Sequence, residues 1–123
     1  MKLLFHTRLN RLWLEKIEQL RNEFSGVDFI TDVQKADREI KNADAVVAGE
    51  IKREVIQRAK QLKIIFVPYV GIDALPLDYI KTHGIRISNV HGNARSVAER
   101  CIALALSFYG KIIDYHNDLK QFK

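Results

Sequence analysis

Residues 62 to 73 carry the sequence LKIIFVPYVGID, in which β-branched and aromatic residues give way to proline and glycine. The apolar cluster from Ile64 to Val67 is typical of a strand buried in a parallel sheet, and we expect it to be the central strand. Gly71 permits a backbone conformation that a Cβ would hinder, so that successive N–H groups turn outward as an anion site. Taken alone, these residues favour the alternative, an ordinary tight turn with Asp73 capping the next segment.

On both sides of this stretch, segments of strand character alternate with segments of helix character. The predicted strands are residues 2–6, 27–31, 43–49, 62–68 and 85–89, and the predicted helices are 9–24, 32–42, 50–61, 77–82 and 94 to about 114. This alternation with nearly continuous apolar strands predicts a parallel sheet covered on both faces. We therefore expect residues 1–123 to form a single α/β domain, a flavodoxin-like three-layer sandwich with a five-stranded parallel sheet that ends in a long apolar helix.

Composition excludes several classes of protein. With 47% hydrophobic and 28% charged residues, the chain has the balance of an ordinary globular domain, and no run approaches the roughly 20 apolar residues of a membrane span. The net charge of +5 arises from basic residues interleaved with acids, so we expect no nucleic-acid binding. The single cysteine, Cys101, lies in an apolar helical run, where we expect it to be part of the core. The lone thiol and the absence of a signal peptide predict a cytoplasmic protein.

A second glycine-containing loop follows the last predicted strand, in the sequence NVHGNARSVAE from Asn89 to Glu99. Gly92 interrupts the strand, and Asn93 stands where the N-cap of the long helix is expected. The free N–H groups of a helix N-terminus favour anions, although an ordinary capped helix accounts for Asn93 alone. The crevice of such a sheet lies beyond the carboxyl ends of its strands, which directs attention to residues 6–7, 49–50, 68–73 and 89–93.

The two loops, in this order, resemble those of a known family. The segments VPYVGID (67–73), GIRISNV (84–90), and Gly92-Asn93 with SVAE (96–99) are similar to those of the D-isomer-specific 2-hydroxyacid dehydrogenases. That family includes phosphoglycerate, glyoxylate and formate dehydrogenases. The likeness is continuous from about residue 43 to residue 109 and weaker over the first 42 residues. It implies the N-terminal substrate-binding segment of an NAD-dependent oxidoreductase that acts on the CH-OH group of 2-hydroxy acids.

Residue by residue, the resemblance implies a partial substrate site. The backbone N–H groups of Val70 and Gly71 would hold the carboxylate of a small 2-hydroxy or 2-oxo acid. Asn93 would face the substrate and the nicotinamide ring, and Val97 would pack near the cofactor. Tyr69 departs from the family, which often has a small residue there, and it could narrow the pocket or contribute a hydroxyl.

Histidine offers no good alternative site. His91 stands where many members of the family have proline, so it could be mistaken for a catalytic histidine. His6 is expected near the crevice and His83 in a surface turn, and no two histidines are spaced as metal ligands on one helix face. We therefore expect no metal.

The motif that would bind a dinucleotide is also missing from the sequence. The six glycines, at positions 26, 49, 71, 84, 92 and 110, include no G-x-G-x-x-G. The resemblance places this motif, and the catalytic Arg, Glu and His, beyond residue 123. We therefore expect no catalytic residue in this chain and no cofactor bound by it alone, while the resemblance implies NAD(P) for the complete enzyme.

Two functional hypotheses follow. The first is a truncated or split 2-hydroxyacid dehydrogenase, inactive alone, which would need a second polypeptide for cofactor binding and catalysis. The last helix would then lack part of its cover, so we expect a homodimer or pairing with a separately encoded NAD-binding domain through its apolar face, composed of Ile102, Leu104, Leu106, Phe108, Ile112 and Ile113. The second is a non-enzymatic module, derived from the same domain, that binds small carboxylates or partner proteins. A receiver domain and a flavodoxin are excluded, because His6-Thr7 stand where acidic residues or a phosphate loop would be needed.

Overall fold

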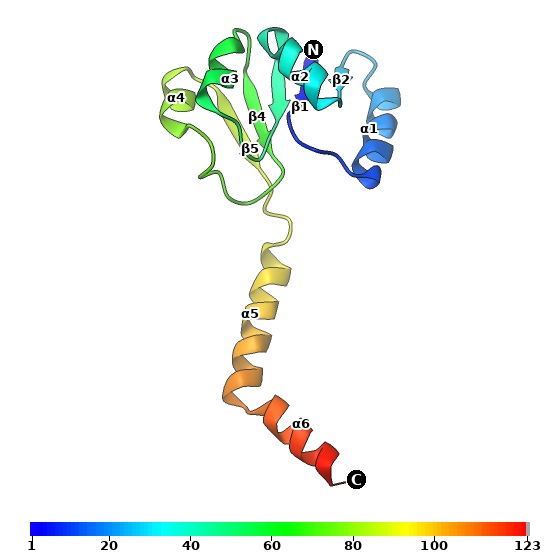
Figure 1. Cartoon of the computed structure of the whole chain (residues 1–123), viewed down its shortest axis with the longest axis vertical. Coiled ribbons are helices and arrows are strands. Elements are labelled where there is room, and N and C mark those ends of the chain that lie inside the picture. Colours follow the sequence, from blue (N-terminus) through cyan, green and yellow to red (C-terminus); the bar gives the residue numbers. More distant parts are fainter. Residues whose placement is uncertain (123) are drawn as a thin grey trace. The chain divides into compact units, whose positions relative to one another are not determined.

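The computed structural model describes residues 1–122, which divide into two compact units (Figure 1). The first unit is Met1–Val90, and the second begins at His91. The first unit contains β1 (Lys2–Phe5), α1 (Arg11–Glu23), β2 (Asp28–Ile30), α2 (Val33–Glu39), the 3₁₀ helix η1 (Ile40–Asn42), β3 (Ala45–Val47), α3 (Arg53–Arg58), β4 (Ile64–Val67), α4 (Leu77–Thr82) and β5 (Arg86–Asn89). The second contains α5 (Ala94–Tyr109) and α6 (Ile112–Gln121). That the two units form one folding domain stays a prediction.

The five strands form one parallel sheet in the order β2-β1-β3-β4-β5, which confirms the predicted flavodoxin-like α/β fold. Every predicted strand contains one observed strand, but the prediction that β4 is central is wrong. β3 holds that position, between β1 and β4. The high apolar content of β4 suggested a central strand, but only one of its faces is fully buried. Ile65 and Val67 are at most 1% exposed, whereas Phe66, which points to the other face, is 38% exposed.

Helices cover the two faces of the sheet unequally. On one face α2, η1, α3 and α4 bury a continuous core that includes Leu4, Val46 and Ile65. On the other face α1 packs its Ile17 against Phe5, Phe29 and Val47, which belong to β1, β2 and β3. Within the first unit, the part of this second face formed by β4 and β5 stays open, with Phe66, Arg86 and Ser88 exposed. The expected three layers are therefore complete on one face and partial on the other.

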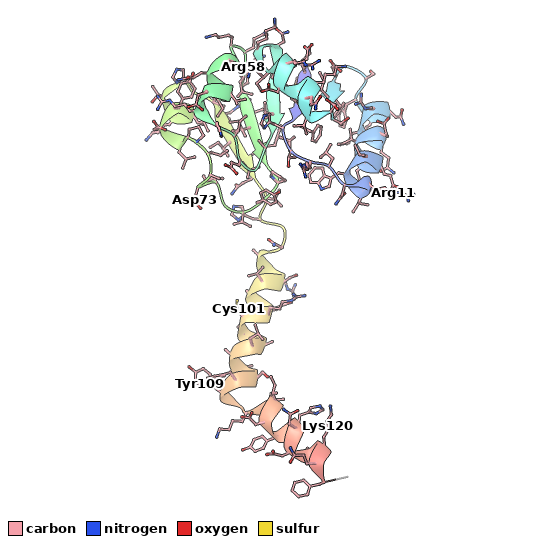
Figure 2. The ribbon with its side chains drawn as sticks, viewed as in Figure 1. Arg11, Arg58, Asp73, Cys101, Tyr109 and Lys120 are labelled. Atoms are coloured by element: carbon pink, nitrogen blue, oxygen red, sulfur yellow. The ribbon has the colours of Figure 1, made fainter. Side chains whose placement is uncertain are left out.

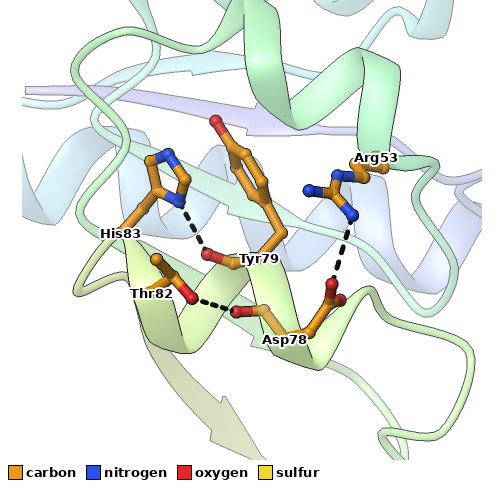
Figure 3. Close-up of polar contacts among 5 residues, drawn as sticks. All are labelled: Arg53, Asp78, Tyr79, Thr82 and His83. Atoms are coloured by element: carbon orange, nitrogen blue, oxygen red, sulfur yellow. Dashed lines mark hydrogen bonds and ion pairs between the residues drawn. The ribbon is translucent and has the colours of Figure 1, made fainter.

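A stacked cluster ties α3 to α4 (Figure 3). Arg53 Nη1 lies 3.1 Å from Asp78 Oδ2, and its guanidinium lies 5.2 Å from the centre of the Tyr79 ring. The ring of His83 stacks on Tyr79 with 3.8 Å between centroids, and His83 Nδ1 donates to the Tyr79 carbonyl oxygen at 2.9 Å. His83 follows α4 as its C-cap, so its expected place in a surface turn is confirmed.

Asp44 holds together the amino ends of three neighbouring strands. The backbone N–H of Lys2 donates to Asp44 Oδ2 at 2.9 Å, and Lys63 Nζ lies 2.9 Å from Oδ1. These contacts, the backbone hydrogen bond first, hold the pKa of the Asp44 carboxyl below its ordinary value of 3.8. A carboxyl whose pKa is lowered by folding stabilises the folded state above its ordinary pKa, and this contribution is lost as the pH falls through the lowered value.

We expect Asp44→Asn to reduce the acid sensitivity of the fold. The wild-type free energy of unfolding should fall more steeply than that of the variant as the pH is lowered from about 5 to below the ordinary pKa. Urea unfolding followed by circular dichroism at several pH values would measure the difference. Asp118→Asn in α6 removes a carboxylate from the second unit, far along the sequence from Asp44, and should keep the wild-type slope. Equal slopes for Asp44→Asn and the wild type would contradict the prediction.

In the second unit, the single helix expected from residue 94 to about 114 is instead two helices. α5 ends at Tyr109, and Lys111 adopts a left-handed conformation with φ 49° before α6 begins. A Cβ at Gly110 would lie 2.8 Å from the Leu106 carbonyl oxygen, so the close turn at the end of α5 requires glycine. No described residue of α5 or α6 is buried, and Cys101 is exposed. The expectation that Cys101 belongs to a core is therefore wrong, because residues 91–122 contain none. Among the described helices, none combines the length and apolar character needed to cross a membrane.

Candidate functional site

The loop that follows β4 lies at the carboxyl edge of the sheet and carries the residues that the sequence points to. It runs from Pro68 to Asp73, which is labelled in Figure 2. Tyr69 and Val70 are 58% and 47% exposed, so the loop faces solvent. Residues 6–7 and 49–50 follow β1 and β3, whose carboxyl ends meet at the same edge. The sheet thus brings together the first-unit segments that the crevice argument named.

Two hydrogen bonds from the end of β5 fix the carbonyl groups of this loop. The backbone N–H of Val90 donates to the carbonyl oxygen of Tyr69 at 3.1 Å. The side chain of Asn89 donates through Nδ2 to the carbonyl oxygen of Val70 at 2.7 Å. Both carbonyl groups are therefore directed toward β5.

The direction of these carbonyl groups sets the direction of two N–H groups. In a trans peptide, the C=O of one residue and the N–H of the next point in opposite directions across a rigid plane. The N–H of Val70 shares a plane with the Tyr69 carbonyl, and the N–H of Gly71 shares one with the Val70 carbonyl. Both N–H groups accordingly point away from β5, and neither donates to another of the described residues. Two adjacent free donors on one side of a loop can donate hydrogen bonds to the oxygens of an anion.

Glycine at position 71 is not what turns these groups outward. Among the described glycines only Gly84 has a positive φ, and a Cβ at Gly71 would make an ordinary contact, 3.6 Å from Asp73 Oδ2. The predicted conformational reason for Gly71 is therefore wrong, because the orientation comes from the partners of the neighbouring carbonyl groups. In the alternative of an ordinary tight turn with Asp73 capping the next segment, the turn stays a prediction, but Asp73 does not cap the next helix, since Pro76 occupies the N-cap of α4.

The charge around the loop is not itself attractive to an anion. Asp73 is the one ionisable side chain between Pro68 and Asp73 apart from the phenol of Tyr69, and its carboxylate lies close to Gly71. An anion must therefore approach the two N–H groups on the side away from this carboxylate. Binding that depends on two neutral donors, with no cation in the loop, is expected to be weak.

Below the loop, on the open face of the sheet, lies a small hollow of about 150 Å³. It is lined mainly by apolar residues, among them Trp13, Val47, Phe66 and Val90, and also by the polar residues Ser88 and Asn89. This hollow was not expected from the sequence. Phe66 could have indicated this hollow, because strand alternation directs its side chain to the face opposite Ile65 and Val67.

Asn93 and Val97 lie in the second unit, where their predicted roles stay predictions. Asn93 occupies the N-cap position of α5, as expected, but its side chain makes no capping hydrogen bond. The backbone oxygen of Asn93 accepts from the N–H of Val97 at 3.0 Å, which places Val97 in the first turn of the helix. Val97 is exposed, as is His91.

The turn after β3 does not fit the pyrophosphate of a dinucleotide. A pyrophosphate is bound where a glycine-rich turn between a strand and a helix leaves backbone N–H groups open to it. Gly49 follows β3 in such a position, but the ring of Tyr69 fills the space above it: a Cβ there would lie 2.8 Å from Tyr69 Cδ2. No group of three or more His, Cys, Asp or Glu residues within residues 1–122 could hold a metal ion.

The chain resembles several characterised dehydrogenases in sequence. The D-3-phosphoglycerate dehydrogenase of Archaeoglobus fulgidus is 33% identical over 115 residues, which cover 89% of this chain and 22% of that protein. The formate dehydrogenase of Pichia angusta is 30% identical over 123 residues, with 89% of this chain and 32% of that protein covered. The chain thus spans less than a third of the length of these relatives.

Solved structures share the fold. The PH0520 protein from Pyrococcus horikoshii OT3 superimposes with a TM-score of 0.74 at 24% identity, covering 98% of this chain and 37% of that one. The NAD-dependent formate dehydrogenase from Staphylococcus aureus, in complex with NAD, gives 0.70 at 23% identity, covering 94% and 40%.

Residues 4–109 match the family described as D-isomer specific 2-hydroxyacid dehydrogenase, catalytic domain. The match includes β1 to β5, the loop from Pro68 to Asp73 and nearly all of α5. By this match, which covers most of its length, the chain belongs to the D-isomer-specific 2-hydroxyacid dehydrogenase family.

Proposed function

We propose that this chain is the substrate-binding part of a D-isomer-specific 2-hydroxyacid dehydrogenase, and that it binds the carboxylate of a small 2-hydroxy or 2-oxo acid. The observation that carries the proposal is the pair of adjacent N–H groups of Val70 and Gly71, which both point away from β5 and donate to no described residue. Hydrogen bonds to a charged acceptor are stronger than those between neutral groups, so a carboxylate is the ligand that gains most from these donors.

In this proposal, the loop contributes binding and orientation. The two N–H groups donate to the two carboxylate oxygens. This fixes the position of the 2-carbon of the acid relative to the edge of the sheet. Asn93, whose side chain makes no capping bond, would face that carbon, and Val97 would pack near the nicotinamide. When bound, NAD(P) supplies or accepts the hydride in this family's reaction.

Catalysis, in the same proposal, needs groups that these residues do not provide. Residues 1–123 contain no dinucleotide motif, and no catalytic residue is assigned among them. General acid–base assistance alone contributes about 10²–10⁴-fold to a rate, so the chain by itself is expected to be inactive. We propose that the cofactor and the proton donor are held by a further NAD-binding part, and that the apolar helices of the second unit contact that part or a second copy of the chain. We place the protein in the cytoplasm, in keeping with its single thiol.

Titration of the chain with pyruvate and with glyoxylate tests the proposal. We expect the amide signals of Val70 and Gly71 to move in ¹H–¹⁵N spectra, with a dissociation constant of about 1 mM or weaker, equivalent to about −4 kcal/mol or less favourable. Acetamide, which is neutral and of similar size, is the control and should leave both signals in place. Unmoved signals with every acid would refute the carboxylate site.

A parallel titration with NADH tests the cofactor assignment. No saturable change is expected, and tight binding of NADH to this chain alone would refute the proposal that the cofactor is held by a further NAD-binding part. In the gene, a neighbouring reading frame with G-x-G-x-x-G followed by Arg, Glu and His would support the enzyme. Carboxylate binding without such a frame would favour the non-enzymatic binding module.

A further inference from the structure

We propose that Tyr69, held against Gly49, limits the size of the acid that the loop accepts, so that the site selects acids with a hydrogen or a methyl group beyond the 2-oxo carbon. The inference rests on the proposed carboxylate site and adds to it a residue that determines specificity. Its basis is the place of one aromatic ring beside the two free N–H groups.

The ring of Tyr69 occupies the space where a side chain at position 49 would otherwise lie. A Cβ on Gly49 would overlap Tyr69 Cε2 and lie 2.8 Å from Cδ2 and 3.4 Å from Cζ. The ring therefore rests directly on the backbone of the segment that follows β3. With this backbone behind it, the ring cannot move further in that direction to make room for a ligand.

The two N–H groups face the same side of β4 as this ring. β4 has β5 as one neighbour and β3 as the other. The Tyr69 carbonyl oxygen accepts from Val90 on the β5 side, so the N–H of Val70 points toward the side of β3. Gly49 follows β3, so the ring that covers it lies on the side toward which the N–H points.

The exposed part of the ring is large enough to limit the space beside the two N–H groups. Tyr69 is 58% exposed, although one edge of its ring rests on Gly49. A carboxylate on the two N–H groups would place its remaining atoms beside this exposed surface. A short acid fits there, whereas a bulky substituent would have to displace the ring from Gly49. The bulk of the ring, rather than its hydroxyl, is what excludes an acid with a bulky substituent.

The test compares the affinities of pyruvate and phenylpyruvate for the complete chain, measured from the amide signals of Val70 and Gly71. The wild type should bind pyruvate at least tenfold more tightly than phenylpyruvate, and Tyr69→Ala should reduce that ratio by about tenfold or more. Tyr69→Phe keeps the ring without the hydroxyl and should keep the wild-type ratio. Gly49→Ala adds a Cβ behind the ring, which should push the ring toward the ligand and keep or raise the wild-type ratio, opposite to Tyr69→Ala. Circular dichroism confirms that each variant is folded.

The outcomes separate this inference from the proposed function. If the wild-type signals of Val70 and Gly71 move with pyruvate but Tyr69→Ala has an unchanged ratio, the size limit is refuted and the carboxylate site stands. The size limit is also refuted if Tyr69→Phe behaves like Tyr69→Ala, or if Tyr69→Ala loses both acids equally. If no acid moves the wild-type signals, the proposed function itself fails.

Discussion

Asn89→Asp is expected to weaken the binding of pyruvate to the loop by at least tenfold. In the wild type, Asn89 Nδ2 donates to the Val70 carbonyl oxygen at 2.7 Å. In the variant, a carboxylate oxygen replaces the donating Nδ2 and faces the Val70 carbonyl oxygen. The two oxygens repel each other, so the peptide between Val70 and Gly71 rotates. The N–H of Gly71 belongs to this peptide and turns with it. A loss of one hydrogen bond to a charged acceptor amounts to about 1.5–3 kcal/mol, or about 10- to 150-fold in affinity.

The added charge of Asn89→Asp would also repel a carboxylate, so the control must carry the same charge. Ser88 precedes Asn89 in β5 and points to the opposite face of the sheet, where it is exposed. Ser88→Asp therefore adds a carboxylate nearby without removing the hydrogen bond, and Asn89→Ala removes the hydrogen bond without adding a charge. We expect Asn89→Asp to lose most affinity, Asn89→Ala to lose less and Ser88→Asp to lose least. An equal loss in the two aspartate variants would attribute the effect to charge and contradict the role of the hydrogen bond.

Leu104→Glu in α5 is expected to abolish self-association of the chain. Residues 101–109 have the sequence CIALALSFY, so this half of α5 is apolar on all sides, which is typical of a helix that is covered all round. In the structure none of α5 is buried, and Leu104 is 70% exposed. Covering one leucine contributes about 1.5–3 kcal/mol, and a symmetric dimer covers two, so the dissociation constant should rise at least 100-fold.

Light scattering coupled to size exclusion would measure this change. The wild type should elute with twice the chain mass of 14.2 kDa, and Leu104→Glu with the mass of one chain. Arg100→Glu alters the charge in the polar half of α5 and should leave the dimer intact. A wild-type chain that is monodisperse and monomeric at high concentration would contradict self-association, and would favour the NAD-binding part as the cover for this helix.

The strand pattern was sufficient to predict the fold, but not the position of each strand. The five strands, their parallel direction and the α/β class follow from apolar runs that alternate with helical periodicity. The central position of β3 does not, because Ala45–Val47 is short and less conspicuous than the cluster from Ile64 to Val67. Strand order depends on which strands pair, and apolar density along a single strand does not report pairing.

The position of the candidate site could be predicted from the sequence, but the reason for the orientation of its N–H groups could not. The carboxyl-edge argument named the loop at residues 68–73 and the segment at 89–93, and the first unit brings the loop together with Asn89 and Val90. The orientation of the two N–H groups depends on a backbone hydrogen bond from Val90 and a side-chain hydrogen bond from Asn89 across 19 residues, which no periodicity records. Likewise, the break between α5 and α6 depends on the left-handed conformation of a single lysine, Lys111, a residue type with no preference for it.

The hydrogen bonds made by Asn89 and Val90 have a mechanical consequence. Val90 is the last residue of the first unit, so tension on the chain beyond it acts first on these two residues. Displacing them would free the carbonyl groups of Tyr69 and Val70 and let both peptides rotate. An acid held by those peptides would oppose the displacement, and tension would in turn expel the acid, since such a linkage is reciprocal. The affinity of the loop for the acid and the force needed to displace Asn89 and Val90 would then depend on each other.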